Sequence, residues 1–281
     1  MNDQAMRALI HSFVNNALTE FNLRMKSWPT RFANNEEHEV LGALLARQAT
    51  LAIQLAESPS IWTGDIAPII LRAMADVHIT VVWILKAPEE RSRQFIRYGL
   101  GQAKLNLEHR KAALDPAHPD PKYQVLLEAL EGWITAQRFT WLTEVNLGSW
   151  SGKNVREMAE ESDCLDFYNH VYSPFSGCAH STWEHVERYN LRKCQNPLHR
   201  YHRVAMVPDM PIDPYYLRLV AKYLNKTFHA FDEVNSTKGL QPDVLDLLDQ
   251  EWAKQSETDP EDSGPDSVQT LHPPEPLGDS K

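Results

Sequence analysis

Residues 64–85 read GDIAPIILRAMADVHITVVWIL and predict the central helix of the fold. Pro68 falls in the first turn of the helix expected here, where its missing amide hydrogen costs no hydrogen bond. The residues after it are apolar on nearly every side of the helix, which is typical of a helix at the centre of a bundle. Arg72 and Asp76 interrupt this surface four positions apart, so they share one face. We expect this pair to be satisfied inside the bundle, because an unpaired buried charge is costly.

Helical spacing continues on both sides of this segment. Apolar residues at intervals of three and four predict further amphipathic helices. These span approximately residues 3–26, 35–57, 88–114, 122–145, 153–161, 165–191, 213–234 and 242–253. The proline-rich stretch 195–212 is expected to be an extended connection, and strands to be absent or marginal. The sequence therefore predicts an all-α fold, a multi-helix bundle of about eight helices within residues 1–254.

Residues 255–281 differ in composition from the rest of the chain. They carry seven acidic residues against one lysine, a net charge of −6 within a chain total of −10. They are rich in Pro, Ser, Gly and Asp and cannot bury enough apolar surface to fold. The sequence therefore predicts a disordered acidic C-terminal tail.

The cysteines and the apolar runs indicate in which cellular compartment the protein is expected. Cys164, Cys178 and Cys194 form no C-x-x-C pair, which argues against a disulfide framework and favours a reducing compartment. The N-terminal residues show no continuous apolar core of a signal peptide. The run at residues 77–85 is too short to span a bilayer. We therefore expect a cytoplasmic protein with no membrane partner.

A second polar feature lies near residues 165–191. Tyr168, Tyr172, Ser176, His180 and Glu184 follow one another at four-residue intervals, and Pro174 within the row predicts a kink or a break. The most secure part is Ser176, His180 and Glu184. A histidine beside a carboxylate and a hydroxyl supplies the ingredients of general-base chemistry. The alternative is a hydrogen-bonded network inside the bundle, because buried polar groups need partners whether or not they react.

We call these five residues, together with Arg72 and Asp76, the polar seam. The expected partners of Arg72 across the bundle are Glu184, Tyr168 or Tyr172. If Arg72 and His180 face one pocket, they would bind a phosphate or another anion. If they do not, the seam fixes the register of the helices.

A basic stretch follows the seam. It contains His185, Arg188, Arg192, Lys193, His199, Arg200, His202 and Arg203, and Glu184 and Glu187 are the acids between His180 and Arg203. Such a local excess in an acidic protein is suited to RNA or DNA phosphates, and the alternative is a solvated surface segment. The sequence has no Glu-x-x-His pair, and His199-x-x-His202 lies in the proline-rich connection, so we expect no metal site and no cofactor.

Several motifs resemble a bacterial helical family of unknown function over about residues 40–190. They are Arg72-x-x-x-Asp76, Trp83-Ile84-Leu85, Glu89-Glu90-x-x-Arg93-x-Phe95-x-x-Tyr98 and Tyr172-x-x-x-Ser176-x-x-x-His180. The chain also loosely resembles the HEPN superfamily, helical bundles that include RNA-cleaving toxins and antiphage effectors. Those proteins use an Arg and a His a few residues apart, and this chain offers Arg31 with His38, Arg72 with His78, and Arg192 with His199.

Two functions follow as predictions. The first is a metal-independent, nucleic-acid-directed protein, ribonuclease-like and used in defence, acting on RNA or another phosphate-bearing ligand. His180 would be the general base, Arg72 would stabilise phosphate charge, and Glu184 and Ser176 would assist. The binding residues would be Asp76, Tyr172, Tyr168, Arg188, Arg192, Lys193, Arg200 and Arg203. The second function is a non-enzymatic helical interaction module, with a structural seam. A homo-oligomer is compatible with either.

Overall fold

A computed structural model describes residues 3–29, 35–114, 120–137 and 148–257. Its longer helices are α1 (Asp3–Ser27), α2 (Asn35–Ala56), α3 (Ala67–Leu85), α4 (Pro88–Ala112), α5 (Pro121–Thr135), α10 (Tyr215–Asn235) and α11 (Val244–Glu257). The shorter elements are η2 (Pro59–Ile61), α6 (Val155–Glu161), α7 (Leu165–Phe167), η4 (Tyr168–Tyr172), α8 (Ser173–Ala179) and α9 (Trp183–Asn190). The predicted all-α bundle is confirmed. The predicted acidic tail from residue 258 onward, and the second part of the helix predicted at 122–145, lie outside the described residues.

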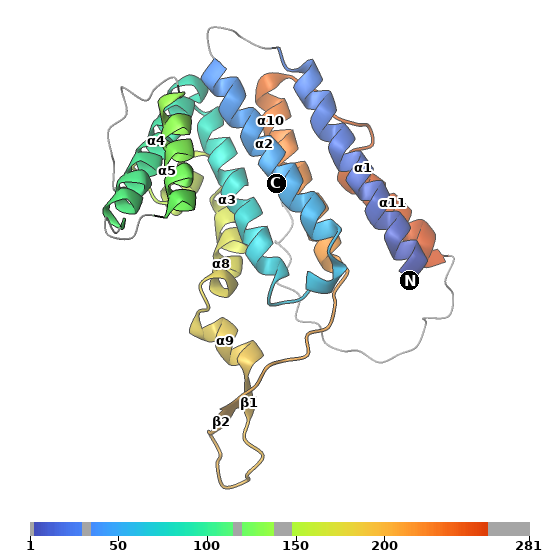
Figure 1. Cartoon of the computed structure of the whole chain (residues 1–281). Coiled ribbons are helices and arrows are strands. Elements are labelled where there is room, and N and C mark those ends of the chain that lie inside the picture. The colour runs from blue at the N-terminus through green and yellow to red at the C-terminus, as the bar shows by residue number, and fades with distance from the viewer. Residues whose placement is uncertain (1–2, 30–34, 115–119, 138–147, 258–281) are drawn as a thin grey trace.

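Helix α3 lies at the centre of the bundle, as its composition predicts. It packs against α2 on one side and α10 on another, while α6, α8 and η4 cover a further part of its surface (Figure 1). Leu71, Met74 and Ile79 of α3 are fully buried in the main core. Helices α1 and α11, from the two ends of the described chain, pack side by side and close the bundle.

By length and composition α3 could also cross a membrane. The run at residues 77–85, which is too short to span a bilayer, is only part of this 19-residue helix. Most of its residues are buried by neighbouring helices. A core position therefore accounts for its apolar composition without a bilayer.

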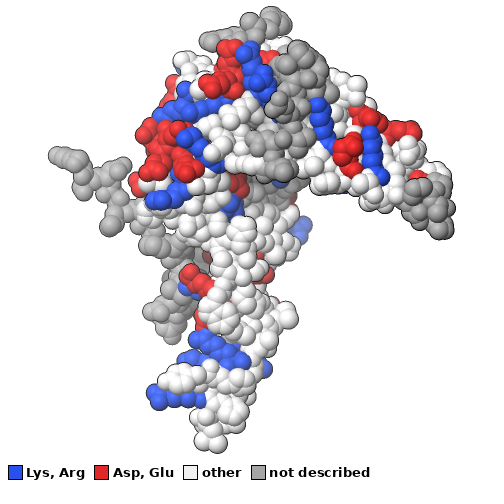
Figure 2. All heavy atoms as spheres, turned by 90° about the vertical axis from the view of Figure 1, so that its left-hand side faces the viewer, with Lys and Arg blue, Asp and Glu red and all other residues white. Residues whose placement is uncertain are grey.

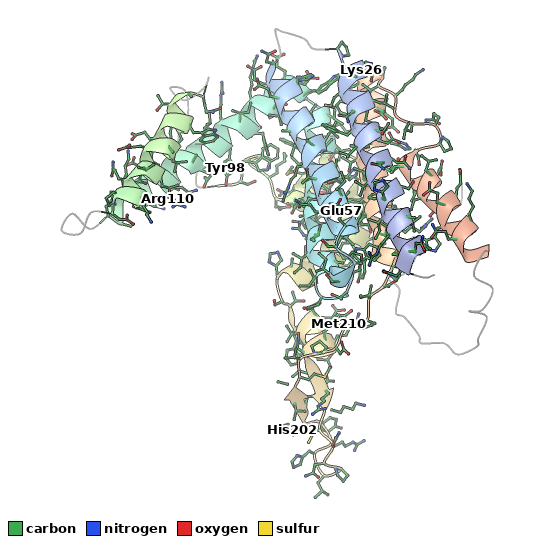
Figure 3. The ribbon with its side chains drawn as sticks, turned by 45° about the vertical axis from the view of Figure 1, so that its right-hand side comes forward. Lys26, Glu57, Tyr98, Arg110, His202 and Met210 are labelled. Atoms are coloured by element: carbon green, nitrogen blue, oxygen red, sulfur yellow. The ribbon has the colours of Figure 1, made fainter. Side chains whose placement is uncertain are left out.

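Two parts of the chain project from this bundle. The distal part of α4 pairs with α5 around a small separate core of Leu107, Leu127 and Ile134, and Figure 3 shows this arm around Tyr98 and Arg110. At the other end, β1 (Leu191–Lys193) and β2 (Arg203–Ala205) pair antiparallel and form a hairpin that extends beyond the helices (Figures 1 and 3). We call residues 191–205 the hairpin. The extended connection predicted at 195–212 therefore contains one strand of a small sheet.

A charged network is buried between α1 and α10. The Arg24 guanidinium donates to Asp232 through Nε at 2.9 Å and Nη2 at 2.7 Å, and it pairs with Glu20 through Nη1. Arg24 is 1% exposed and Glu20 is 0% exposed. A Cβ atom at Gly239 would collide with Glu20 and Arg24, so this position accepts no side chain without rearrangement.

A second buried network joins α2, α3 and α10. The Nδ1 atom of His78 lies 3.1 Å from the hydroxyl of Thr227, and Gln48 donates to the same hydroxyl at 3.0 Å. His78 is 2% exposed. Burial lowers the pKa of His78 to about 3, and the nearby positive charge of Lys226 lowers it further. His78 is therefore neutral at physiological pH.

Candidate functional site

The polar seam is assembled around Arg72, which α3 presents to α8 and η4. Its Nε donates to the hydroxyl of Ser176 at 2.6 Å, and its Nη1 pairs with Asp76 one turn along α3. The guanidinium carbon lies 3.2 Å from the centre of the Tyr172 ring, a cation–π contact. The predicted pairing of Arg72 with Asp76 and the predicted contact with Tyr172 are thus confirmed, and Ser176 is an additional partner.

A π-helix places these partners. Residues Tyr168–Tyr172 form η4, and the amide of Ser173 donates to the carbonyl of Tyr168, five residues back. This wide turn stacks the rings of Tyr168 and Tyr172 with their centres 4.8 Å apart. Pro174 then lies in the first turn of α8, where its missing amide hydrogen is tolerated. The predicted irregularity at Pro174 is therefore a π-turn that continues into a helix, and such turns are frequent at functional sites.

The electrostatics of the seam follow from its partial burial. Burial raises the pKa of Asp76 above its ordinary value, against the lowering effects of Arg72, a hydrogen bond with Tyr172 and the nearby charge of His180. Burial, followed by the charge of Asp76, raises the pKa of Tyr172 to about 12. Arg72 is 9% exposed, whereas the Asp76 side chain is 46% exposed. Within the Arg72–Asp76 pair, solvent therefore reaches the carboxylate more readily than the guanidinium.

His180 and Glu184 do not lie on the one helical face that their four-residue spacing predicted. Helix α8 ends at Ala179 with His180 as its C-cap. Ser181 then adopts a left-handed backbone with φ 49°, so Glu184 belongs to the next helix, α9. The Glu184 side chain is 85% exposed and faces Arg188 at 3.8 Å. The predicted contact between Glu184 and Arg72 is wrong. His180 is exposed, and it is close enough to Asp76 to lower the pKa of that carboxyl.

The basic stretch is divided between α9 and the hairpin. Arg188 lies on α9 beside Glu184, and Arg203 on β2 pairs with Glu187 of α9. Arg192, Lys193 and Arg200 are exposed on the hairpin, and none of the described carboxylates forms an ion pair with them. Among the described residues of this stretch, Arg192, Lys193 and Arg200 can therefore bind an anion without first breaking an ion pair.

Within the described part of the chain, two groups of side chains have the composition of a metal site. One is Asp65, Cys178 and His185, and the other is Cys194, His199 and His202. The expectation of no metal site rested on the missing Glu-x-x-His pair and on the place of His199 and His202 in the proline-rich connection. Nothing in the local sequence pattern predicts that Cys194 meets these two histidines across the hairpin. A separate surface hollow at α10 and α11, which Tyr215, Arg218, Asp249 and Trp252 help to line, contains no residue of the seam.

The comparisons with known proteins agree with the family resemblance. No curated protein and no solved structure matches the chain. The model of a family of unknown function, DUF5677, matches residues 38–197, close to the range of about 40–190 predicted from the motifs. Nothing in the comparisons links the chain to the HEPN superfamily. The match spans more than half of the chain and includes all residues of the seam and the first strand of the hairpin, so this protein belongs to the DUF5677 family of unknown function.

Proposed function

We propose that this protein binds nucleic acid, single-stranded RNA in particular, and that the hairpin contacts the phosphates. The observation that carries the proposal is the charge of the hairpin. Residues 191–205 contain four Lys and Arg residues and no Asp or Glu, in a chain with a net charge of −10. Figure 2 shows Lys and Arg side chains on the lower end of the molecule, where the hairpin projects from the bundle. A projecting cationic element in an acidic protein attracts polyanions locally.

The side chains of the hairpin are suited to bind a single-stranded nucleic acid. Arg192, Lys193 and Arg200 are exposed and form no ion pair with a described carboxylate, so binding a phosphate breaks no such pair. Tyr201 is 87% exposed, and the guanidinium of Arg200 lies 5.6 Å from the centre of its ring. Exposed aromatic rings next to cations provide stacking surfaces for unpaired bases.

The polar seam is less suited to hold phosphate. The charge of Arg72 is already paired with Asp76, and its side chain is only 11% exposed. An anion that bound through Nε or took over the ion pair at Nη1 would have to displace the hydroxyl of Ser176 or the carboxylate of Asp76. This geometry favours a structural role for Arg72, in which it fixes the register of α3 against α8.

Replacing Arg192, Lys193 and Arg200 together by Gln tests the proposal. Loss of three phosphate contacts is expected to reduce the slope of log affinity against log salt concentration by about 2 for single strands. Fluorescence anisotropy with a labelled oligoribonucleotide, repeated over a series of salt concentrations, measures this slope. The matched control replaces Arg47, Arg110 and Lys122, three exposed cations of the helices, by Gln.

The two triple variants carry the same net charge, so a general electrostatic effect would appear in both. Equal losses in both variants, or no binding by the wild type, would contradict the proposal. Stronger binding to DNA of the same sequence would reassign the ligand while keeping the hairpin as the contact.

A ribonuclease is the second candidate, and the position of His180 favours it. This side chain is exposed at the end of α8 and interacts with the charge of Asp76. An exposed imidazole beside a carboxylate can accept a proton from a ribose hydroxyl. For this candidate we also propose the cytoplasmic location and the role in defence that the sequence led us to expect.

The variant His180→Ala separates the ribonuclease from a structural role. Because His180 is exposed, its removal is expected to leave the unfolding midpoint in urea unchanged. If the chain cleaves RNA through His180, the variant should lose at least about 100-fold in rate. Exposed His170 on η4 provides the control, since His170→Ala should leave cleavage intact. Intact RNA after incubation with the wild type would exclude the ribonuclease and leave the binding proposal in place.

A further inference from the structure

The loop end of the hairpin gathers a thiol and two imidazoles. Cys194 directly follows β1, and His199 and His202 lie in the returning segment before β2. One ligand atom from each of the three lies within 4.8 Å of the others. Figure 3 shows His202 near the far end of the hairpin, away from the helices. A thiolate with imidazoles is the donor set that zinc prefers, and calcium and magnesium prefer oxygen.

The distances fit a tetrahedral ion. Zinc bonds to sulfur at about 2.3 Å and to nitrogen at about 2.0–2.1 Å, which places the two atoms roughly 3.5 Å apart on a tetrahedral edge. The Sγ atom of Cys194 and the Nδ1 atom of His199 are 3.6 Å apart. The rings of His199 and His202 have their centres 5.3 Å apart and are tilted by 69°. His202 is exposed, and one of its ligand atoms already lies within 4.8 Å of the donor atoms of Cys194 and His199.

The backbone holds the three residues in this arrangement. The amide of Cys194 donates to the carbonyl of His202 at 3.0 Å, which extends the pairing of β1 and β2 by one step. The amides of His199 and His202 close two successive turns, on the carbonyls of Asn196 and His199. The loop therefore brings the donors together through its main chain, independently of a metal.

The second group of potential ligands is less suited to an ion. Cys178 donates its thiol to the backbone carbonyl of Asp65 at 3.0 Å, and burial raises the pKa of this thiol to about 11. The carboxylate of Asp65 is occupied by His185 at 2.8 Å. These contacts keep the Cys178 thiol protonated and join α8 and α9 to the segment before α3. In the other group Cys194 is partly exposed, and His199 and His202 are exposed.

We propose that the hairpin binds one zinc ion through Cys194 Sγ, His199 Nδ1 and a ring nitrogen of His202. The thiol releases its proton to solvent on binding, and water occupies the fourth position. The ion crosslinks the two sides of the loop at residues 194–202. This proposal does not depend on the binding of nucleic acid.

Titration of the reduced, metal-free chain with cobalt, a spectroscopic substitute for zinc, tests the site. The expected result is a thiolate-to-cobalt charge-transfer band that saturates at one equivalent and disappears when zinc is added. The variant Cys194→Ser should lose this band, and His199→Ala and His202→Ala should weaken binding. Cys178→Ser is the matched control and should keep the band, because it alters the competing group.

Limited trypsin digestion gives a second readout that needs no cobalt. Lys193, Arg200 and Arg203 are cleavage sites in or beside the loop, and zinc should slow cleavage there in the wild type and in Cys178→Ser but not in Cys194→Ser. The proposal is overturned if the wild type binds no cobalt, or if the band survives in Cys194→Ser. A band lost only in Cys178→Ser would assign the metal to the competing group. Circular dichroism confirms that each variant is folded.

Discussion

Replacing Arg24 by Met is expected to lower the free energy of unfolding by about 3–5 kcal/mol, because it leaves buried carboxylates without a counter-charge. Glu20 is 0% exposed and loses its cationic partner, and Asp232 loses the hydrogen bonds from Nε and Nη2 of Arg24. The guanidinium carbon of Arg24 also lies 4.4 Å from the centre of the Phe228 ring, and methionine would restore only the apolar part of this contact. Urea denaturation followed by circular dichroism measures the change.

The control for Arg24 lies on the same helix. Arg7 pairs with Asp3 at 2.7 Å, but both side chains are more than three-quarters exposed. Exposed pairs one turn apart contribute little, so Arg7→Met should leave the urea midpoint unchanged. A loss at Arg24 no larger than the loss at Arg7 would show that the buried network does not stabilise the bundle.

Acidification is expected to destabilise the protein through His78. The pKa of His78 is about 3 in the folded chain and 6.5 in the unfolded chain, so the unfolded state binds a proton first as the pH falls. The contribution of the neutral histidine is complete above pH 6.5 and is lost between pH 6.5 and about 3. Within this window the loss approaches about 1.4 kcal/mol per pH unit.

The variant His78→Gln isolates this effect. Glutamine keeps a polar group beside Thr227 but does not titrate, so the free energy of unfolding should fall less steeply with acidification than in the wild type. The raised pKa of Asp76 acts in the opposite direction and is common to both proteins. Exposed His11→Gln should retain the wild-type slope. Parallel slopes in wild type and His78→Gln from pH 7 to pH 4 would contradict the assignment.

The sequence predicts the core of this fold because the signals are local. The apolar surface of α3 and the four-residue spacing of Arg72 and Asp76 depend on helical geometry alone, and both predictions are confirmed. Glu184 shows where such reasoning fails. Its spacing from His180 holds only if the helix continues, and the left-handed backbone at Ser181 ends it. Ser181 and Thr182 before an acidic first turn are the local signal in the sequence for a new helix start.

The hairpin could not be predicted in the same way. Its strands have three residues each, too few for an alternating pattern to be recognised. The meeting of Cys194 with His202 depends on the register of β1 against β2, which is a contact between residues distant along the chain. The charge of the hairpin was visible in the sequence, but its projection from the bundle was not.

The π-helix at Tyr168–Tyr172 holds one residue more than the same turn of an α-helix would. An α-helix turns by about 100° per residue, so an extra residue in a regular helix would rotate α8 by about that angle against α7. The wide turn absorbs this residue locally and so keeps Ser176 on the face that meets Arg72. A chain shortened by one residue here would therefore form a regular helical turn and keep a bond equivalent to Arg72–Ser176, whereas the stacking of Tyr168 on Tyr172 would change.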